Sequence, residues 1–384
     1  MKFSEVIGQD DARQRLVRLV DEGRLPHAML FCGPPGCGKL AMAMAFASYL
    51  LCSNRHDGDS CGTCPQCVML RKWAHPDLHF TFPVFKPANT SADYKPISDD
   101  FISEWREQLA GGPYFTIEQW LTTMGVTTQQ AIMTVKEADT VTHKLSLKSS
   151  QGGYKVSLVW LPERMNEQTA NKLLKIIEEP PSQTVFLMVS EQPNMLLETI
   201  RSRTQRFDMP RISTEGIEEA LVRLRGIDAE AAHRIARYAE GNWLKALDAL
   251  DAESENRQFL NDFKTLTRGS FKRDVSGLML WSTDASKLGR EKEKRMLAYF
   301  LRMIRESFVY NFHQSELCYM TTEEEQFVRN FAPFVHENNV MQLSEILDKA
   351  IVDIGRNVNG RMVFFDLALQ FTVLIRTSYL NAAR

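Results

Sequence analysis

A glycine-rich loop between an apolar strand and a helix is the feature that most constrains this chain. Residues 33–40 read GPPGCGKL and join the short apolar segment 27–32 to the longer apolar segment 40–51. In such a setting the glycines let backbone N–H groups surround phosphate oxygens at a helix N-terminus, which favours anions. We therefore predict a phosphate-binding loop. Its candidate contacts with a nucleotide are Gly33, Gly36, Gly38 and Lys39.

The loop lacks the side chains that hold Mg²⁺ in working ATPases. Such loops end in Ser or Thr, whose hydroxyl binds the ion, but Leu40 stands at that position. A second apolar strand should end in Asp-Glu, and it ends instead in Trp160 and Leu161. A shift of two residues brings Glu163 to the Glu position, but then Pro162 replaces the Asp. We predict no Mg²⁺-dependent hydrolysis, and the sequence leaves open whether the loop binds ATP or ADP.

The first 210 residues alternate apolar strands with helices, which predicts an α/β fold. Strands are expected at 27–32, 154–161 and 184–190, and helices at 10–22, 40–51, 127–146 and 166–178. Such alternation produces a doubly wound parallel sheet with helices on both faces. Residues 83–130 interrupt the pattern with several prolines and a GGP break. We interpret them as an insertion with helices at 101–109 and 116–124.

No strand is predicted after Pro210. Residues 211–254 contain three short amphipathic segments, which indicate a small helical bundle. Residues 255–384 contain longer ones, including helices expected at 292–312 and 340–354. A chain of 384 residues is too long for one ordinary core, so a division at these two boundaries is physically reasonable.

Four of the seven cysteines crowd into one short segment: Cys52, Cys61, Cys64 and Cys67. Four thiolates at C-x₂-C spacing suit tetrahedral zinc in a closed, structural site. A C-x₂-C-x₂-C run also occurs in ferredoxins, where a fourth cysteine follows three residues later. Here the fourth lies nine residues upstream, which favours zinc. We expect the other three, Cys32, Cys37 and Cys318, to be ordinary small buried residues.

Composition and charge exclude a membrane protein but do not decide on nucleic acid. The net charge is −2, which permits local basic faces without predicting one. The first residues lack the apolar stretch of a signal peptide, and the apolar segment 40–52 is too short to span a bilayer. We expect a cytoplasmic chain with reduced cysteines, for which a metal cluster is more reasonable than disulfides.

Several motifs together resemble the delta-prime family of subunits of the bacterial DNA polymerase III clamp loader, which are AAA+ proteins. They are VIGQDDA at 6–12, LPHAMLFCGPPGCGK at 25–39, the cysteine module followed by HPD at 75–77, MNEQTANKLLKIIEEPP at 165–181, LLETIRSR at 196–203 and RNVNGR at 356–361. The resemblance covers most of residues 1–210 and is looser beyond. It implies an AAA+ P-loop module at 1–210 that carries the zinc module (52–67), a helical lid at 211–254 and an all-helical collar at 255–384.

The resemblance also implies a role and partners. Such subunits form a pentamer with gamma/tau and delta subunits that loads the sliding clamp onto primer-template DNA, and contact of this chain with clamp and DNA would be indirect. Arg203, in the segment SRT where the family usually has SRC, would be an arginine finger for a neighbour's ATP, with Arg201 as its competitor. Alternatively, Arg203 pairs with a local acid such as Asp208 or Glu198. Leu244 stands where active AAA+ members usually carry the lid arginine.

Two other functions compete with this interpretation. One is an active AAA+ clamp-loader ATPase of the gamma/tau type, against which Leu40 and Trp160 argue. The other is a zinc-dependent nucleic-acid-binding protein with a vestigial phosphate loop. It requires basic and aromatic residues around the cysteines, and the nearby candidates are few: Arg55, Arg71, Lys72 and Trp73.

Overall fold

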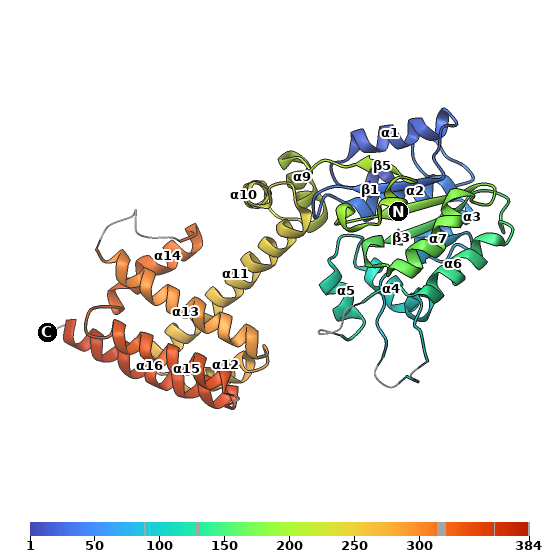
Figure 1. Cartoon of the computed structure of the whole chain (residues 1–384). Coiled ribbons are helices and arrows are strands. Elements are labelled where there is room, and N and C mark those ends of the chain that lie inside the picture. The colour runs from blue at the N-terminus through green and yellow to red at the C-terminus, as the bar shows by residue number, and fades with distance from the viewer. Residues whose placement is uncertain (88–89, 92, 127–130, 313–319, 357, 383–384) are drawn as a thin grey trace. The chain divides into compact units, whose positions relative to one another are not determined.

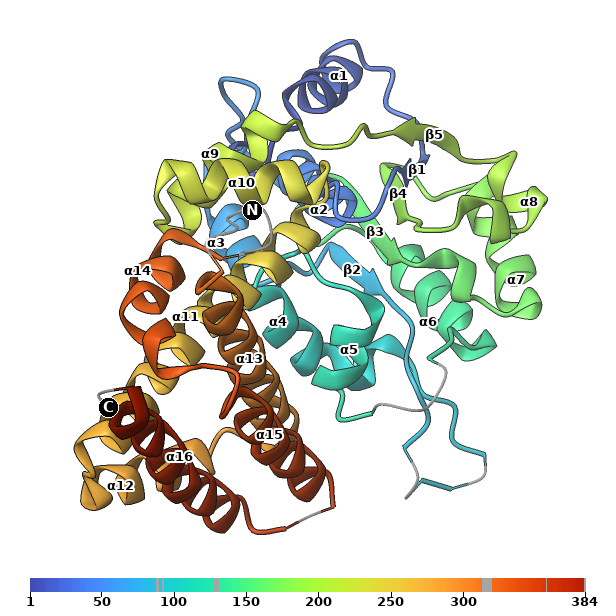
Figure 2. The same cartoon turned by 90° about the vertical axis from the view of Figure 1, so that its left-hand side faces the viewer.

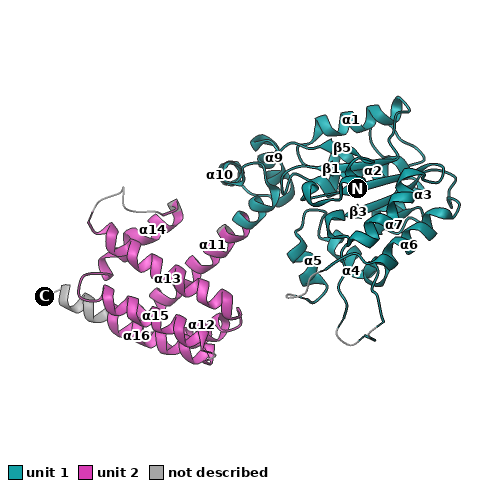
Figure 3. Cartoon of the chain, viewed as in Figure 1, with its two compact units in different colours: residues 1–249 teal, residues 250–384 magenta. Residues whose placement is uncertain are grey.

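The computed structural model describes residues 1–384 with the exception of 88–89, 92, 127–130, 313–319, 357 and 383–384. These described residues form two compact units, Met1–Ala249 and Leu250–Arg384 (Figure 3). The division falls within helix α11 (Trp243–Lys272), and the predicted division into three parts stays a prediction. No helix in the described ranges is both long enough and apolar enough to cross a membrane.

A five-stranded parallel sheet forms the centre of the first unit. Its strands are β1 (Ala28–Cys32), β2 (Leu78–Thr81), β3 (Lys155–Trp160), β4 (Thr184–Val189) and β5 (Gln205–Asp208), in the order β2-β3-β4-β1-β5. All strand pairings among the described residues are parallel. This confirms the predicted α/β fold. Sequence analysis missed the two edge strands, β2 and β5, which have only four residues each.

Helices cover both faces of this sheet. Side chains alternate between the two faces along each strand, so one strand contributes residues to two cores. From β1, Met29 and Phe31 join one core with α1 (Asp10–Asp21) and α2 (Lys39–Leu51). Ala28, Leu30 and Cys32 join the opposite core, with α6 (Val135–Ser146) and α7 (Glu167–Glu178). Figures 1 and 2 show these helix layers on the two sides of the strands.

The remaining elements of the first unit are short helices. They are η1 (Phe3–Glu5), α3 (Pro65–Arg71), η2 (Ser98–Phe101), α4 (Ile102–Ala110), α5 (Ile117–Thr123), η3 (Pro162–Arg164), η4 (Pro193–Met195), α8 (Glu198–Arg201), α9 (Thr214–Arg225) and α10 (Ala229–Ala239). The helix predicted at 127–146 begins later, at Val135. Ile132 and Met133 instead pair in bridges with Val84 and Met165, and residues 127–130 lie outside the described ranges.

The insertion is built around buried tryptophans, which the sequence analysis did not anticipate. Its helices α4 and α5 contribute Trp105 and Trp120, whose exposed fractions are both 0%. The Trp105 ring stacks on Phe82 at 4.2 Å, and the Trp120 indole N–H donates to the carbonyl of Pro83 at 2.9 Å. These rings belong to the same core as α1 and α2. The insertion is therefore packed as part of the α/β domain.

The second unit is helical throughout its described residues. After α11 it contains α12 (Val275–Ala285), α13 (Arg290–Tyr310), α14 (Thr322–Phe331), η6 (Ala332–Phe334), α15 (Val340–Gly355) and α16 (Gly360–Ala382). Helices α13 and α15 match those expected at 292–312 and 340–354. The third short helix predicted in the lid is instead the start of α11, which runs without interruption for 30 residues. Cys318 and Asn357, which bear on earlier predictions, lie outside the described residues.

Candidate functional site

The phosphate loop connects β1 to α2, as its sequence predicts. Gly36 and Gly38 have φ values of 68° and 90°, a left-handed region where glycine has no steric cost. Gly38 is the N-cap of α2. All thirteen residues of α2 are buried, so the helix is fixed within the core and holds the loop at its N-terminus.

Lys39 points its charge into its own loop. The ammonium donates to the carbonyls of Gly33 at 3.0 Å and Pro34 at 2.9 Å. It also lies 3.6 Å from a carboxylate oxygen of Glu191, just after β4. The side chain is only 3% exposed. The lysine that would reach a β- or γ-phosphate is thus already engaged by three oxygens of the chain itself.

Residues distant in sequence lie against the phosphate-facing glycines. A Cβ atom on Gly36 would lie 1.8 Å from Oδ1 of Asn242, and the Trp243 N–H donates to the Gly36 carbonyl at 3.2 Å. A Cβ atom on Gly38 would lie 3.1 Å from the hydroxyl of Tyr114, a residue of the insertion. Burial raises the pKa of that hydroxyl to about 12. The lid segment and the insertion therefore contact the loop, and no local sequence signal indicated either contact.

The positions of the missing magnesium ligands lie in the apolar core. Leu40 is 5% exposed and packs with the residues of α2. The Trp160 ring lies 5.3 Å from Trp105 and 5.1 Å from Phe115 of the insertion, measured between ring centroids. Leu161 is buried in the same core. Aromatic rings thus fill the end of β3, where an active ATPase carries a carboxylate.

Glu163 is the remaining carboxylate near this strand end, and it is used by the backbone. Its Oε1 accepts the N–H groups of Glu191 at 2.8 Å and Gln192 at 3.0 Å. Its Oε2 is buried without a hydrogen-bond partner among the described residues. Glu163 therefore fixes the segment that places Glu191 beside Lys39.

Arg203 follows α8 on the surface of the domain and forms a local ion pair. Its guanidinium bonds to the carboxylate of Glu178, at the end of α7, and donates to the Thr199 carbonyl at 3.0 Å. The alternative interpretation, a pair with a local acid, therefore fits this geometry, but the acid is Glu178 in place of Asp208 or Glu198. Asp208 is bound by Arg206 at 2.8 and 3.0 Å. The paired side chains of Arg203 and Glu178 are 37% and 43% exposed, and such surface pairs contribute about 0–1 kcal/mol.

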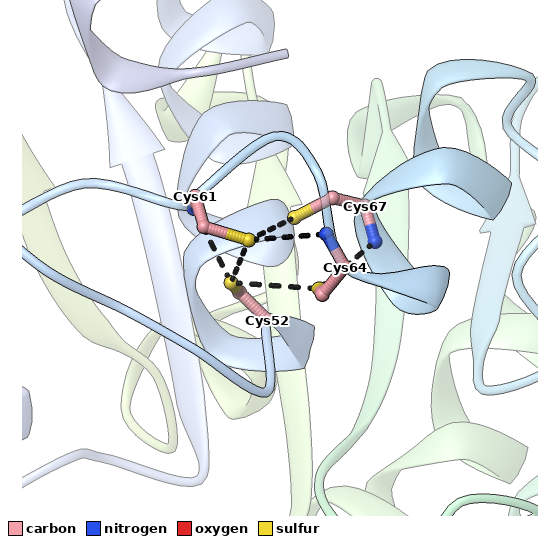
Figure 4. Close-up of side chains that lie close together, drawn as sticks. All are labelled: Cys52, Cys61, Cys64 and Cys67. Atoms are coloured by element: carbon pink, nitrogen blue, oxygen red, sulfur yellow. Dashed lines mark hydrogen bonds between the residues drawn. The ribbon is translucent and has the colours of Figure 1, made fainter.

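The four clustered cysteines bring their sulfur atoms together at the C-terminal end of α2 (Figure 4). Three sulfur–sulfur distances are 3.6 Å for Cys52–Cys61, 3.9 Å for Cys52–Cys64 and 3.8 Å for Cys61–Cys67. The edge of a tetrahedron with metal–sulfur bonds of about 2.3 Å is about 3.8 Å. The arrangement is therefore compatible with a structural zinc ion.

Backbone N–H groups stabilise the thiolate form of Cys61, whereas burial raises the pKa of the Cys52 and Cys67 thiols. Cys61 Sγ accepts from the N–H groups of Thr63 at 3.4 Å and Cys64 at 3.3 Å. These bonds lower the pKa of the Cys61 thiol to about 5. The N–H of Cys67 donates to Cys64 Sγ at 3.4 Å. A ligand shell with such donors is typical of zinc knuckles, because the metal requires deprotonated sulfur.

The other described cysteines do not join a cluster. Cys32 and Cys37 are fully buried with free thiols, and burial raises the pKa of both. They fit the expectation of ordinary core residues.

Leu244, the position where a lid arginine was expected in active members, is half-buried. Its backbone N–H donates to Asn242 Oδ1 at 3.0 Å as α11 begins.

The parallel sheet and the phosphate loop between β1 and α2 together define an α/β protein with a P-loop module. The model of the family described as "DNA polymerase III, delta subunit" matches residues 8–213. The match covers more than half of the chain, so the chain belongs to this family, as a delta-prime type of subunit.

Similar proteins carry related names. A DNA polymerase III subunit delta' from Pseudomonas aeruginosa is 32% identical over 221 residues, which are 57% of this chain and 54% of that protein. A DNA polymerase III subunit gamma/tau from Mycobacterium tuberculosis is 28% identical over 222 residues, 58% of this chain and 31% of that protein. The chain thus spans about half of the first relative and a third of the second. A gamma subunit-related protein from Thermotoga maritima aligns over 95% of this chain and 100% of its own at 14% identity, with a TM-score of 0.32.

Proposed function

We propose that this chain is a subunit of the bacterial DNA polymerase III clamp loader that does not hydrolyse ATP itself. The observation that carries the proposal is the engagement of Lys39 by Gly33, Pro34 and Glu191. Phosphoryl transfer depends on positioning and on neutralisation of charge by a lysine and Mg²⁺. Here the lysine is turned inward and the metal positions are apolar, and both features support the proposal.

The proposed contribution to catalysis is Arg203, supplied to the ATP site of a neighbouring subunit. An arginine at that site stabilises charge that develops on the transferred phosphoryl group, and fingers supplied in trans are worth about 10³–10⁵ in rate. The surface ion pair with Glu178 is weak, so Arg203 can leave it and bind a γ-phosphate at little cost in free energy. The planar guanidinium also suits phosphate better than an ammonium does. Arg201 is the competing finger, and it forms no ion pair within the described ranges.

The proposed assembly is a pentamer with gamma/tau and delta subunits in the cytoplasm. The chain would contact the sliding clamp and primer-template DNA through these partners, without a membrane. Within it, Cys52, Cys61, Cys64 and Cys67 would hold one structural zinc ion. A metal bound by four protein thiolates has no open position for substrate, so its role would be to fix the loop that follows α2.

The experiment is reconstitution of the loader with Arg203→Ala and measurement of ATP turnover stimulated by clamp and DNA. We expect the complex to assemble and turnover to fall, because the adjacent ATP site loses its finger. Arg206→Ala is a matched control, since Arg206 is a nearby exposed arginine in a surface pair. Full turnover with Arg203→Ala would rule out this residue. The same result with Arg201→Ala would leave the segment without a catalytic role.

The second candidate is an active ATPase subunit of the gamma/tau type, which the 28% identity to a gamma/tau protein favours. The two functions separate in one assay of the pure chain. The proposal predicts no magnesium-dependent release of phosphate above background. Turnover that requires Lys39 and Mg²⁺ would establish the second candidate instead.

A further inference from the structure

A hollow of about 600 Å³ opens on the second unit between α11 and α14. Its floor is aromatic, formed by Phe271, Phe327, Phe331 and Phe334. Phe271 is 43% exposed, so part of its ring faces solvent at this hollow. We name this hollow the α11–α14 groove.

One wall of the groove is cationic. Lys264, Arg268 and Lys272 line it from α11, and their spacing of four residues places them on one face of the helix. Lys264 pairs with Glu323 on the opposite rim at 3.0 Å. In the described part of the chain, Arg268 and Lys272 form no ion pair. The groove thus combines an apolar floor with two cations, Arg268 and Lys272, that no acid of the described residues pairs with.

We propose that the α11–α14 groove binds an acidic peptide segment of a partner protein, in which one large apolar side chain is flanked by carboxylates. The apolar side chain would enter the hollow, where buried aromatic anchors supply most of the energy of such interfaces. The carboxylates would pair with Arg268 and Lys272, and arginine can bind a carboxylate through two parallel hydrogen bonds. The proposal does not rest on the role assigned to Arg203 or to the phosphate loop.

A peptide fits the groove better than single-stranded nucleic acid does. Nucleobases need open ring faces on which successive bases stack. Here Phe327 and Phe331 stack on each other at 5.4 Å and 20°, and Phe271 meets Phe334 edge-on at 5.3 Å and 66°. The rings therefore occupy one another's faces, and a single hollow accommodates one or two large side chains instead of a track of bases.

The amides of Gln326 and Asn330 complete the match to a peptide. Both residues are exposed and line the groove from α14. Four residues apart, they lie on the same face of that helix. Side-chain amides both donate and accept hydrogen bonds, so they can bind the backbone of an extended or helical segment.

The test is titration of the full chain into three fluorescein-labelled peptides of twelve residues, measured by fluorescence anisotropy. Each peptide carries four Asp or Glu residues around one anchor, which is Phe, Leu or Trp. We expect saturable binding by at least one peptide with Kd of about 10–100 μM. Replacement of the anchor by Ser, or of the acids by Lys, should weaken binding at least about tenfold.

Variants locate the binding site. Arg268→Glu with Lys272→Glu, and separately Phe271→Ser, should each weaken binding at least about tenfold, whereas Lys349→Glu, an exposed cation on α15, should not. Circular dichroism checks that each variant is folded. A benzoylphenylalanine anchor should cross-link to α11 or α14. The proposal would be overturned by the absence of saturation up to about 1 mM peptide, or by unchanged peptide affinity in the groove variants. It would also be overturned if the chain bound a labelled oligothymidine and not the peptides, and the groove variants abolished that binding.

Discussion

The two ends of helix α2 carry the two most recognisable motifs of the chain, and their side chains behave in opposite ways. At the N-terminal end, Lys39 is bound by oxygens of its own loop. At the C-terminal end, Cys52 and three further cysteines place their sulfurs within 4.8 Å of one another. Each motif therefore predicts the path of the backbone at its end of α2. Whether its functional atoms are available depends on residues that the motif does not contain.

The difference has a physical origin in how each motif is completed. The four cysteines lie within one short segment and supply a full tetrahedral set of ligands. The phosphate loop needs a magnesium ligand from β3 and an open approach to its glycines. Trp160 occupies the position of the magnesium ligand, and Asn242 and Tyr114 restrict the approach to the glycines. A site assembled from several distant segments can thus be lost while its local motif remains.

The largest expected effect lies at the cysteine end. Cys61→Ser should reduce zinc from about one ion per chain to a small fraction and cost several kcal/mol of stability, because metal binding in such modules is coupled to folding. Metal analysis and thermal unfolding check this. Cys32→Ala is the control, since it removes a buried thiol outside the cluster. Full stability of metal-free protein would show that the sulfurs pack without an ion.

A pair of glycine substitutions measures how tightly Asn242 packs against the phosphate loop. Gly36→Ala and Gly226→Ala both place a side chain at a left-handed φ, 68° and 66°, which costs about 1–2 kcal/mol. Only the first also meets Asn242, since nothing lies within 4 Å of a Cβ on Gly226. Chemical denaturation should show the larger loss for Gly36→Ala. Equal losses would mean that Asn242 moves away readily and the loop can open.

Substitution of Lys39 separates a structural role from nucleotide binding. Lys39→Met leaves the carbonyls of Gly33 and Pro34 without their charged donor, and a hydrogen bond to a charged group contributes about 1.5–3 kcal/mol. We expect the free energy of unfolding to fall by this amount. The affinity for a fluorescent ATP analogue should not change. A variant of normal stability that loses nucleotide affinity would contradict the closed loop.

A pH-dependent effect concerns Glu137 on α6, whose carboxylate accepts a hydrogen bond from the N–H of Ser98, within the insertion, at 2.7 Å. Burial raises the pKa of its carboxyl from 4.5 to about 7. The folded chain then binds more protons than the unfolded chain between these values, so stability falls as the pH rises through this window. Glu137→Gln should flatten that dependence in unfolding curves at pH 5, 6 and 7. An unchanged slope would assign the proton to another group.

Local patterns predicted the elements that have a continuous apolar run or an apolar stripe, and they missed those defined by tertiary contact. Strands β1, β3 and β4 are continuous apolar runs, and α7 has a clear apolar stripe between Asn166 and the prolines. Strand β5 has three exposed residues of four, so it has no such signal.

The candidate site divides in the same way. The cysteine cluster was predictable because all its ligands lie within one segment, and their sulfurs converge. The partners of Lys39 and of the loop glycines were not, because Glu191 and Asn242 are about 150 and 200 positions further along the chain. The resemblance predicted Arg203 as an arginine finger, and that role stays a prediction. Its pairing with Glu178 depends on where α7 ends.

The aromatic packing of the insertion has an optical consequence. Three of the six tryptophans, Trp105, Trp120 and Trp160, lie within one cluster and are at most 3% exposed. Their ring centroids are separated by 5.2 Å and 5.3 Å from Trp105, close enough for excitation to pass between them. Detachment of the insertion would expose these indoles to water and shift their emission to longer wavelengths. The chain therefore contains an intrinsic fluorophore that reports whether the end of β3 is covered.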